Sequence, residues 1–212
     1  TMYYILKDAD IYATNIRYMN DSEEYLNGIK ELEIIMNDYS DEKGINRCIT
    51  EEMLLQTEEQ QPESYSISFS AERDLLSQWS MYAKESGVSL GMEFNGAMVY
   101  KIPEFRGNED NKIIFQNLVP QKVYYCTKRA MEKDMYNSVK EDILNNLLKL
   151  DSVRDIIDSA EGIWKENIPY IKRYEFKAEG EYRLVFTDKN LDKRFQIEYR
   201  LDKNVLKPYI KV

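Results

Sequence analysis

The sequence predicts an α+β domain with a mixed or antiparallel sheet and flanking helices. Strand and helix patterns alternate irregularly along the 212 residues, and strand patterns gather near the end of the chain. No glycine-rich phosphate loop follows an expected strand, which argues against a doubly wound fold. Hydrophobic residues make up 43% of the chain, enough to bury a sizeable core. We therefore expect one domain over residues 1–212.

The first expected elements are the last turns of a helix at residues 2–7 and a short strand at residues 11–14. Asn20, Asp21 and Ser22 then have side chains that cap helices. The helix that follows carries apolar residues at helical spacing, namely Tyr25, Ile29, Leu32 and Met36. A second helical pattern covers about residues 41–58, and Pro62 ends it.

Residues 64–70 (SYSISFS) alternate small polar residues with Tyr65, Ile67 and Phe69. This period of two is typical of a half-buried strand. The next helix is expected at residues 74–84, and it carries a set of large apolar residues: Leu75, Leu76, Trp79 and Tyr82.

The second half of the chain has the patterns of further strands and two long helices. The strands are expected at residues 88–94, 113–126 (interrupted by Pro120), 182–186, 194–200 and 208–212. The helices are expected at residues 128–149 and 152–167, and Pro169 ends the second.

The chain has no histidine, which removes several classes of catalysis. Ser-His and Cys-His nucleophile activation, His-ligated zinc and imidazole acid–base chemistry are excluded. Carboxylates, tyrosines, lysines, arginines and hydroxyl groups remain. The two cysteines, Cys48 and Cys126, are far apart and form neither a metal-binding pair nor a disulfide framework. No metal is expected.

The net charge of −9 argues against non-specific binding to nucleic acid, which needs a basic surface. No apolar run approaches the roughly 20 residues of a membrane span. The N-terminus lacks the basic and apolar regions of a signal peptide. We therefore expect a cytoplasmic protein without a membrane partner.

Three segments carry motifs in a characteristic order. They are residues 11–25 (IYATNIRYMNDSEEY), 68–94 (SFSAERDLLSQWSMYAKESGVSLGMEF) and 171–186 (IKRYEFKAEGEYRLVF). Together they resemble a bacterial family known as domain of unknown function 2971. Relatives usually begin with an aromatic-rich strand and continue with another strand after the last. The resemblance therefore implies that this chain lacks a first and a last strand of its family.

The layout is also similar to that of the ADP-ribosyltransferase superfamily. In that fold a middle strand carries a small hydroxyl motif, here Ser66 or the pair Ser68 and Ser70. A late strand carries a Glu-x-Glu motif, here Glu179 and Glu181. The resemblance implies NAD as substrate, with Glu181 holding the ribose 2′-hydroxyl and stabilising the charge that forms as nicotinamide leaves. Glu179 would activate the acceptor.

Spacing adds a structural expectation for this motif. Glu179 and Glu181 stand two residues apart at the start of a strand, so their side chains are expected on one face. Arg183 lies on the same face and can pair with Glu181. An ion-paired, solvated strand is the alternative interpretation of the same residues.

Further substrate-binding candidates are Arg17, Tyr18 and Asn20, which follow the first expected strand. A guanidinium can form two hydrogen bonds with a diphosphate, and a tyrosine ring can stack on a base. For Asn20, capping chemistry favours a helix cap. Trp79 and Tyr82 share a helix face and offer stacking surfaces, although such a face more often packs in a core.

The function that these expectations favour is a toxin-like or phage-defence effector that uses NAD or a related nucleotide. The reaction would be ADP-ribosyl transfer or NAD cleavage. The alternative is a non-catalytic nucleotide-sensing or protein-interaction module of a defence system. A protein partner or a homo-oligomer stays open. A metal-dependent nuclease built on Glu179, Glu181 and a distant aspartate is a third hypothesis, without a recognisable ligand spacing.

Overall fold

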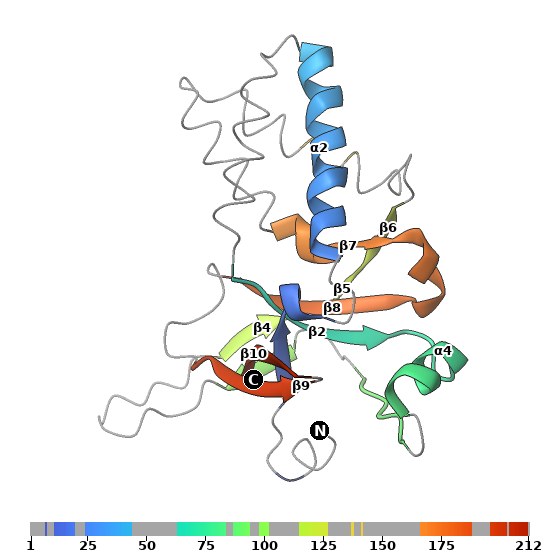
Figure 1. The fold of residues 1–212 in the computed structure, drawn as a ribbon, viewed down its shortest axis with the longest axis vertical. Helices are drawn as coiled ribbons and strands as arrows, with labels where there is room; N and C mark the ends of the chain where they lie inside the picture. The colour runs from blue at the N-terminus through green and yellow to red at the C-terminus, as the bar shows by residue number, and fades with distance from the viewer. Residues whose placement is uncertain are drawn as a thin grey trace. The chain divides into compact units, whose positions relative to one another are not determined.

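The computed structural model describes residues 7, 11–19, 24–43, 63–83, 87–93, 98–101, 115–126, 137, 141, 166–187, 196–202 and 204–211 (Figure 1). The chain divides into two compact units. The first unit is formed by Thr1–Asn15, Tyr65–Val123 and Lys177–Val212, and the second by Ile16–Ser64 and Tyr124–Phe176.

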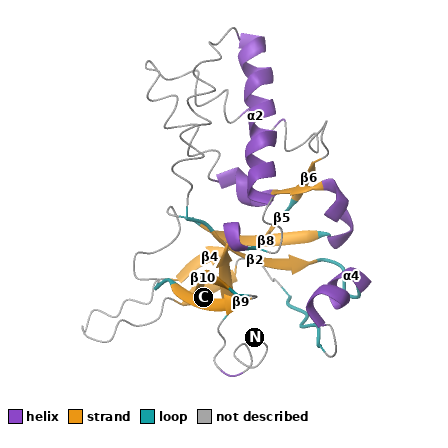
Figure 2. Cartoon of the chain, in the orientation of Figure 1, coloured by secondary structure: helices purple, strands orange, loops and turns teal. Residues whose placement is uncertain are grey.

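The first unit is built on a six-stranded sheet in the order β5-β8-β2-β1-β10-β9. Every neighbouring pair in it is antiparallel. The strands are drawn in orange in Figure 2. The strands are β1 (Tyr12–Asn15), β2 (Tyr65–Ser70), β5 (Gln121–Lys122), β8 (Glu181–Phe186), β9 (Glu198–Asp202) and β10 (Val205–Lys211). The expected strand pattern of residues 64–70 is thus confirmed as β2, at the centre of the sheet.

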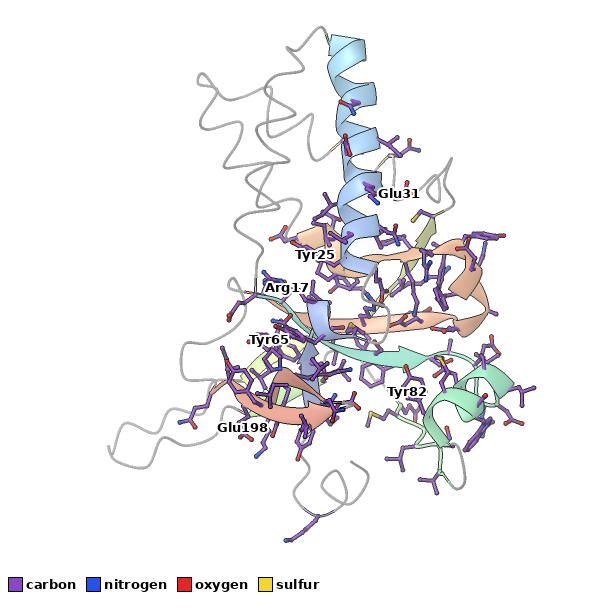
Figure 3. The ribbon with its side chains drawn as sticks, in the orientation of Figure 1. Arg17, Tyr25, Glu31, Tyr65, Tyr82 and Glu198 are labelled. Atoms are coloured by element: carbon purple, nitrogen blue, oxygen red, sulfur yellow. The ribbon has the colours of Figure 1, made fainter. Side chains whose placement is uncertain are left out.

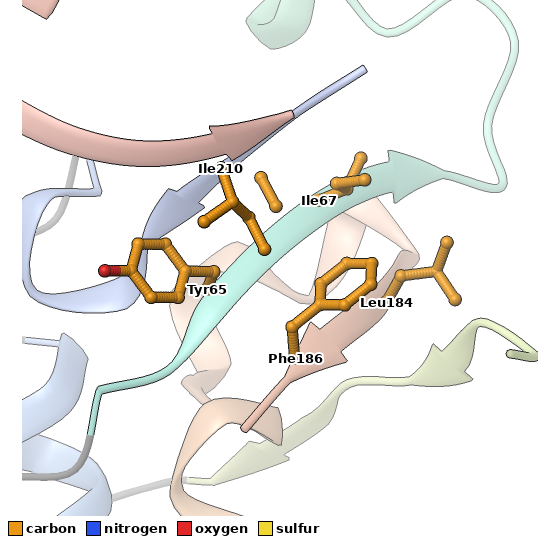
Figure 4. Close-up of a cluster of buried hydrophobic side chains, with 6 residues drawn as sticks. Tyr65, Ile67, Leu184, Phe186 and Ile210 are labelled. Carbon is orange, nitrogen blue, oxygen red and sulfur yellow. The ribbon is translucent and has the colours of Figure 1, made fainter. Parts of the chain in front are cut away.

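One face of this sheet carries the core of the unit (Figure 4). Ile67 lies opposite Leu184 and Tyr65 opposite Phe186, because β2 and β8 pair in that register. The buried cluster comprises Ala13, Tyr65, Ile67, Leu184, Phe186 and Ile210, with Ile11 and Phe69 packed against it. Since side chains alternate along a strand, the intervening serines of β2 lie on the opposite face.

The first unit also contains a separate antiparallel pair, β3 (Met98–Lys101) with β4 (Phe115–Leu118). A short helical segment follows β2 and consists of α4 (Leu76–Gln78) and a π-helical turn, η2 (Trp79–Ala83). The 3₁₀ segment η4 (Tyr174–Glu179) leads into β8.

The second unit combines a 20-residue helix, α2 (Glu24–Lys43), with a parallel strand pair. The pair is β6 (Tyr124–Cys126) with β7 (Ile171–Arg173), and two 3₁₀ segments, η1 (Ile16–Tyr18) and η3 (Ile168–Tyr170), complete the described part. Helix α2 contacts both β7 and η3. Gly28 allows this approach, since a Cβ there would lie 3.1 Å from Cγ2 of Ile168.

The predicted α+β class is confirmed in this coarse form. The strands expected at residues 11–14, 182–186, 194–200 and 208–212 correspond to β1, β8, β9 and β10 with small shifts of their ends. Helix α2 confirms the helical pattern after the cap, and both Tyr25 and Ile29 are buried. The caps at residues 20–22 and most of the helices expected at 41–58, 128–149 and 152–167 lie outside the described residues.

One of the expected strands is wrong, and one of the expected helices differs in how it packs. Residues 87–93 form no strand, and Val88 is 60% exposed. No described strand pairs with this segment, and alternation alone does not make a strand without a hydrogen-bonded neighbour. The helix expected at residues 74–84 is confirmed over Leu76–Ala83, as α4 and η2. Its apolar residues are only partly packed: Leu75 and Trp79 are half-buried, whereas Leu76 is 83% and Tyr82 65% exposed.

Within the described ranges, no helix combines the length and hydropathy needed to cross a membrane.

Candidate functional site

The Glu-x-Glu motif occupies a corner of the backbone. Glu179 is the last residue of η4, and Glu181 is the first residue of β8. Gly180 between them has a φ of 51°, which glycine adopts readily and other residues do not. The expectation that both carboxylates share one strand face is therefore wrong, because Glu179 precedes the strand and the chain turns at Gly180.

Backbone hydrogen bonds hold this corner in place. The amide of Gly180 donates to the carbonyl of Lys177 (3.2 Å), and the amide of Ala71 donates to the carbonyl of Gly180 (3.0 Å). The amide of Val123 donates to the carbonyl of Glu181 (2.9 Å). These bonds connect the motif to the residues that directly follow β2 and β5, the two strands on either side of β8.

Glu181 and Arg183 form a buried ion pair within β8. Nε of Arg183 donates to Oε1 of Glu181 at 2.6 Å, and an Nη donates to Oε2 at 3.2 Å. The side chains are only 2% (Arg183) and 5% (Glu181) exposed. The predicted pairing of Arg183 with Glu181 is confirmed. The alternative interpretation, an ion pair exposed to solvent, is wrong. Because both side chains are almost fully buried, removal of either one would leave the other as an uncompensated charge with little solvation.

The serine strand runs directly beside this pair. In the β2–β8 register Ser70 lies opposite Glu181 and Ser68 opposite Arg183. Directly opposed residues of an antiparallel pair project from the same face, so the Ser-x-Ser and Glu-x-Arg motifs share a surface. Ser68 and Ser70 are both exposed. Two motifs more than a hundred residues apart in sequence therefore meet here.

Ser70 also contacts Glu179. Its hydroxyl donates to the backbone carbonyl of Glu179 at 2.7 Å and accepts from the amide of Glu72 at 3.2 Å. The Glu179 side chain is buried as well, at 7% exposure of the residue. Ser70 therefore connects the end of β2 to the turn that places both glutamates.

The aromatic candidates belong to the helical segment after β2 (Figure 3). Nε1 of Trp79 donates to Oδ1 of Asp74 at 2.6 Å, which fixes the indole close to the start of the segment. Tyr82 projects outwards and is 65% exposed. Neither side chain is part of the register that joins β2 to β8.

Arg17 and Tyr18 lie in η1, which belongs to the second unit. Tyr18 is 37% exposed. Arg17 is close enough to Tyr25 to act on its ionisation: burial raises the pKa of Tyr25 to about 12, and the positive charge of Arg17 opposes that rise. Asn20 lies outside the described residues. Arg17 and Tyr18 thus belong to the second unit, whereas Glu179 and Glu181 belong to the first.

The second unit contains a buried thiol, that of Cys126, which is not among the predicted site residues. Cys126 is 4% exposed, and its Sγ donates to the carbonyl of Lys172 at 3.3 Å. Burial, followed by the neighbouring Glu31, raises the pKa of the thiol to about 12. Burial also raises the pKa of the Glu31 carboxyl. A protonated, enclosed thiol is a poor nucleophile, so Cys126 is a packing residue.

The structure also joins side chains of β1, β9 and β10 in a polar network that sequence patterns did not indicate. The hydroxyl of Tyr209 donates to Glu198 at 2.7 Å, and Lys211 lies 2.9 Å from the same carboxylate. Nη2 of Arg200 donates to Oγ1 of Thr14 at 2.9 Å. In the part of the chain that the structure describes, no three acidic or cysteine side chains gather to form a metal site.

A family model described as "Protein of unknown function (DUF2971)" matches residues 78–184. The chain belongs to this family. No curated protein and no solved structure matches it.

The DUF2971 match includes three of the predicted site residues at its end, namely Glu179, Glu181 and Arg183. It also includes Trp79 and Tyr82 at its beginning. Ser68, Ser70 and Arg17 precede the matched range, so they are placed by the structure of this chain alone.

Proposed function

We propose that this member of the DUF2971 family processes NAD or a related nucleotide, by ADP-ribosyl transfer or NAD cleavage, as an effector of bacterial conflict or phage defence. The support is one observation: the β2–β8 register sets Ser70 opposite Glu181 and Ser68 opposite Arg183. A hydroxyl strand beside a glutamate strand is the arrangement that an ADP-ribosyltransferase-like layout requires.

In this proposal Glu181 is the catalytic carboxylate. The C1′–N bond of NAD breaks with its electron pair going to the nicotinamide nitrogen, and positive charge develops on the ribose. A fixed carboxylate stabilises that charge and accepts a hydrogen bond from the 2′-hydroxyl. Water or another acceptor then bonds to C1′ and loses its proton to Glu179, acting as general base.

Arg183 has a positioning role in the same scheme. Its two hydrogen bonds set the plane of the Glu181 carboxylate before any substrate arrives. Such preorganisation lowers the cost of reorienting a charge during the reaction. Ser68 and Ser70, which are exposed on the same face, supply hydroxyl groups for the substrate.

Nicotinamide release from NAD tests the proposal. The wild type is expected to release nicotinamide, and Glu181→Gln to lose at least about 100-fold in rate, the size typical of losing one preorganised electrostatic group. Glu72→Gln is the matched control, because Glu72 is exposed and close to Ser70. Equal turnover by the wild type and Glu181→Gln would contradict the assigned role, and no release by the wild type would contradict the reaction.

A non-catalytic nucleotide sensor or protein-interaction module is favoured by a different feature of the same pair. Both oxygens of Glu181 already accept hydrogen bonds from Arg183, and both side chains are almost fully enclosed. Such a pair can serve the fold alone.

Thermal melting with NAD, ADP-ribose and cyclic nucleotides separates the two functions. A ligand at about 100 times its dissociation constant adds roughly 2.7 kcal/mol of stability to the folded state. Stabilisation without turnover supports the sensor, whereas turnover supports the enzyme.

A further inference from the structure

The six-stranded sheet has two edges with different properties. One edge is β5, which has two residues, Gln121 and Lys122. A short edge strand bearing a lysine is a common protection against pairing with other chains. The other edge is β9, which has five residues and pairs with β10. Among the described strands, none pairs with its outer side.

The side chains of β9 separate by type onto its two faces. Tyr199 and Leu201 project from the apolar face and are 64% and 70% exposed, and Ile197, just before the strand, is 39% exposed. Leu206 of β10, opposite Leu201, is 61% exposed. This apolar edge therefore continues the core face of the sheet beyond the part that is covered.

The charged residues of β9 do not protect this edge. Glu198 accepts from Tyr209 and pairs with Lys211, and Asp202 pairs with Lys207 at 2.8 Å. All three partners belong to the inner strand β10. Arg200 donates to Thr14 of β1. Each of these charged side chains thus has a hydrogen-bond or ion-pair partner within its own sheet.

The sequence of β9 is self-complementary in one antiparallel register. With Tyr199 opposite its own copy, Glu198 lies opposite Arg200, and Ile197 lies opposite Leu201. Opposite charges meet on one face and apolar groups on the other, which is the favourable form of cross-strand pairing. With Arg200 at the axis instead, two arginines would oppose each other, and Glu198 would oppose Asp202.

We propose that the outer edge of β9 pairs with β9 of a second copy of this chain. The two six-stranded sheets then join into one continuous antiparallel sheet about a two-fold axis at Tyr199. A two-fold axis is the symmetry that a self-complementary strand requires. The pairing covers Tyr199 and Leu201. It does not depend on the proposed nucleotide reaction, since Glu181 lies on β8, four strands from β9 in the sheet order.

Disulfide trapping tests the register. In a Cys48→Ser background, Tyr199→Cys places two thiols opposite each other at the axis, where directly opposed Cβ atoms lie about 4.5–5.5 Å apart. Mild oxidation is expected to give a covalent dimer. Leu201→Cys is the matched control: it lies opposite Ile197 of the other copy, too far from its own copy to form a disulfide. Equal or faster trapping of Leu201→Cys contradicts the register.

A charge exchange tests the same contact without cysteines. Glu198→Arg alone and Arg200→Glu alone each oppose like charges across the axis, so each is expected to sediment as a monomer where the wild type is a dimer. Mixed together, the two variants again oppose arginine to glutamate, and a heterodimer is expected. Circular dichroism of each variant verifies that it is folded. A monomeric wild type at about 100 µM, or a mixture that stays monomeric while both variants are folded, overturns the proposal.

Discussion

Two sets of opposite charges on the same sheet differ in their surroundings. On β8, Arg183 and Glu181 are 2% and 5% exposed and lie on one strand. On the β9–β10 hairpin, Lys207 pairs with Asp202 and Lys211 with Glu198 across strands, at side-chain exposures of 14% to 40%. Ion pairs with similar N–O distances, from 2.6 to 2.9 Å, thus lie in very different amounts of solvent. We therefore expect their contributions to stability to differ, because solvent screens exposed charges and a buried charge depends on its partner.

The largest expected effect is that of Arg183→Ala. It leaves the Glu181 carboxylate buried without the guanidinium that compensates it, and we expect the free energy of unfolding to fall by about 3–5 kcal/mol. Urea unfolding followed by circular dichroism measures this change. The double variant Glu181→Met/Arg183→Met is the control, because it buries no charge and is expected to recover most of the loss. A wild-type midpoint for Arg183→Ala contradicts the structural role of the pair.

A smaller effect is expected for Tyr209→Phe, which removes the hydrogen bond to Glu198. Near neutral pH the free energy of unfolding should fall by about 1 kcal/mol, the usual net contribution of one hydrogen bond. Tyr182→Phe, on a partly exposed tyrosine of β8, is the matched control and should change little.

The same variant should alter the acid dependence of stability. The Tyr209 hydroxyl, followed by Lys211, lowers the pKa of Glu198 below its ordinary value of 4.5. A carboxyl with a lowered pKa stabilises the folded state above its ordinary pKa, and that contribution is lost as the pH falls through the lowered value. The wild type should therefore lose more stability than Tyr209→Phe on acidification from pH 5. If the stabilities of the wild type and Tyr209→Phe changed with pH in the same way, the hydrogen bond from Tyr209 would not be what lowers the pKa of Glu198.

The smallest effect is expected for Lys207→Ala. Its partner Asp202 is 40% exposed, so the pair should contribute under about 1 kcal/mol. The difference from the wild type should shrink further in 1 M salt, because salt screens exposed charges. If Lys207→Ala lowered the free energy of unfolding as much as Arg183→Ala does, the exposed and the buried ion pairs would not differ in their contribution to stability.

The candidate site was partly predictable from local spacing. Arg183 follows Glu181 by two residues, and a strand places such residues on one face whatever it pairs with. The relation of Glu179 to Glu181 was not predictable in the same way. It depends on where β8 begins and on the positive φ of Gly180, which the neighbouring backbone of Ala71 and Lys177 helps to hold.

The fold shows the same division. Alternation identified β2 because Tyr65 and Ile67 had a core to face. The similar alternation at Val88 gave no strand, because no described strand pairs with it. Strand β7 has three residues and pairs in parallel with β6, so it is too short to carry a pattern of its own.

The sequence by itself determined which chemical groups are present: no histidine, a net charge of −9, and the Ser-x-Ser and Glu-x-Glu-x-Arg motifs. It also predicted that Glu181 and Arg183, two residues apart on a strand, would pair. Only the tertiary structure decided that Ser70 lies opposite Glu181, that the ion pair is buried, and that no described strand pairs with the outer side of β9. Spacing along one strand is set by local backbone geometry, whereas register, burial and strand order depend on contacts between segments distant in sequence.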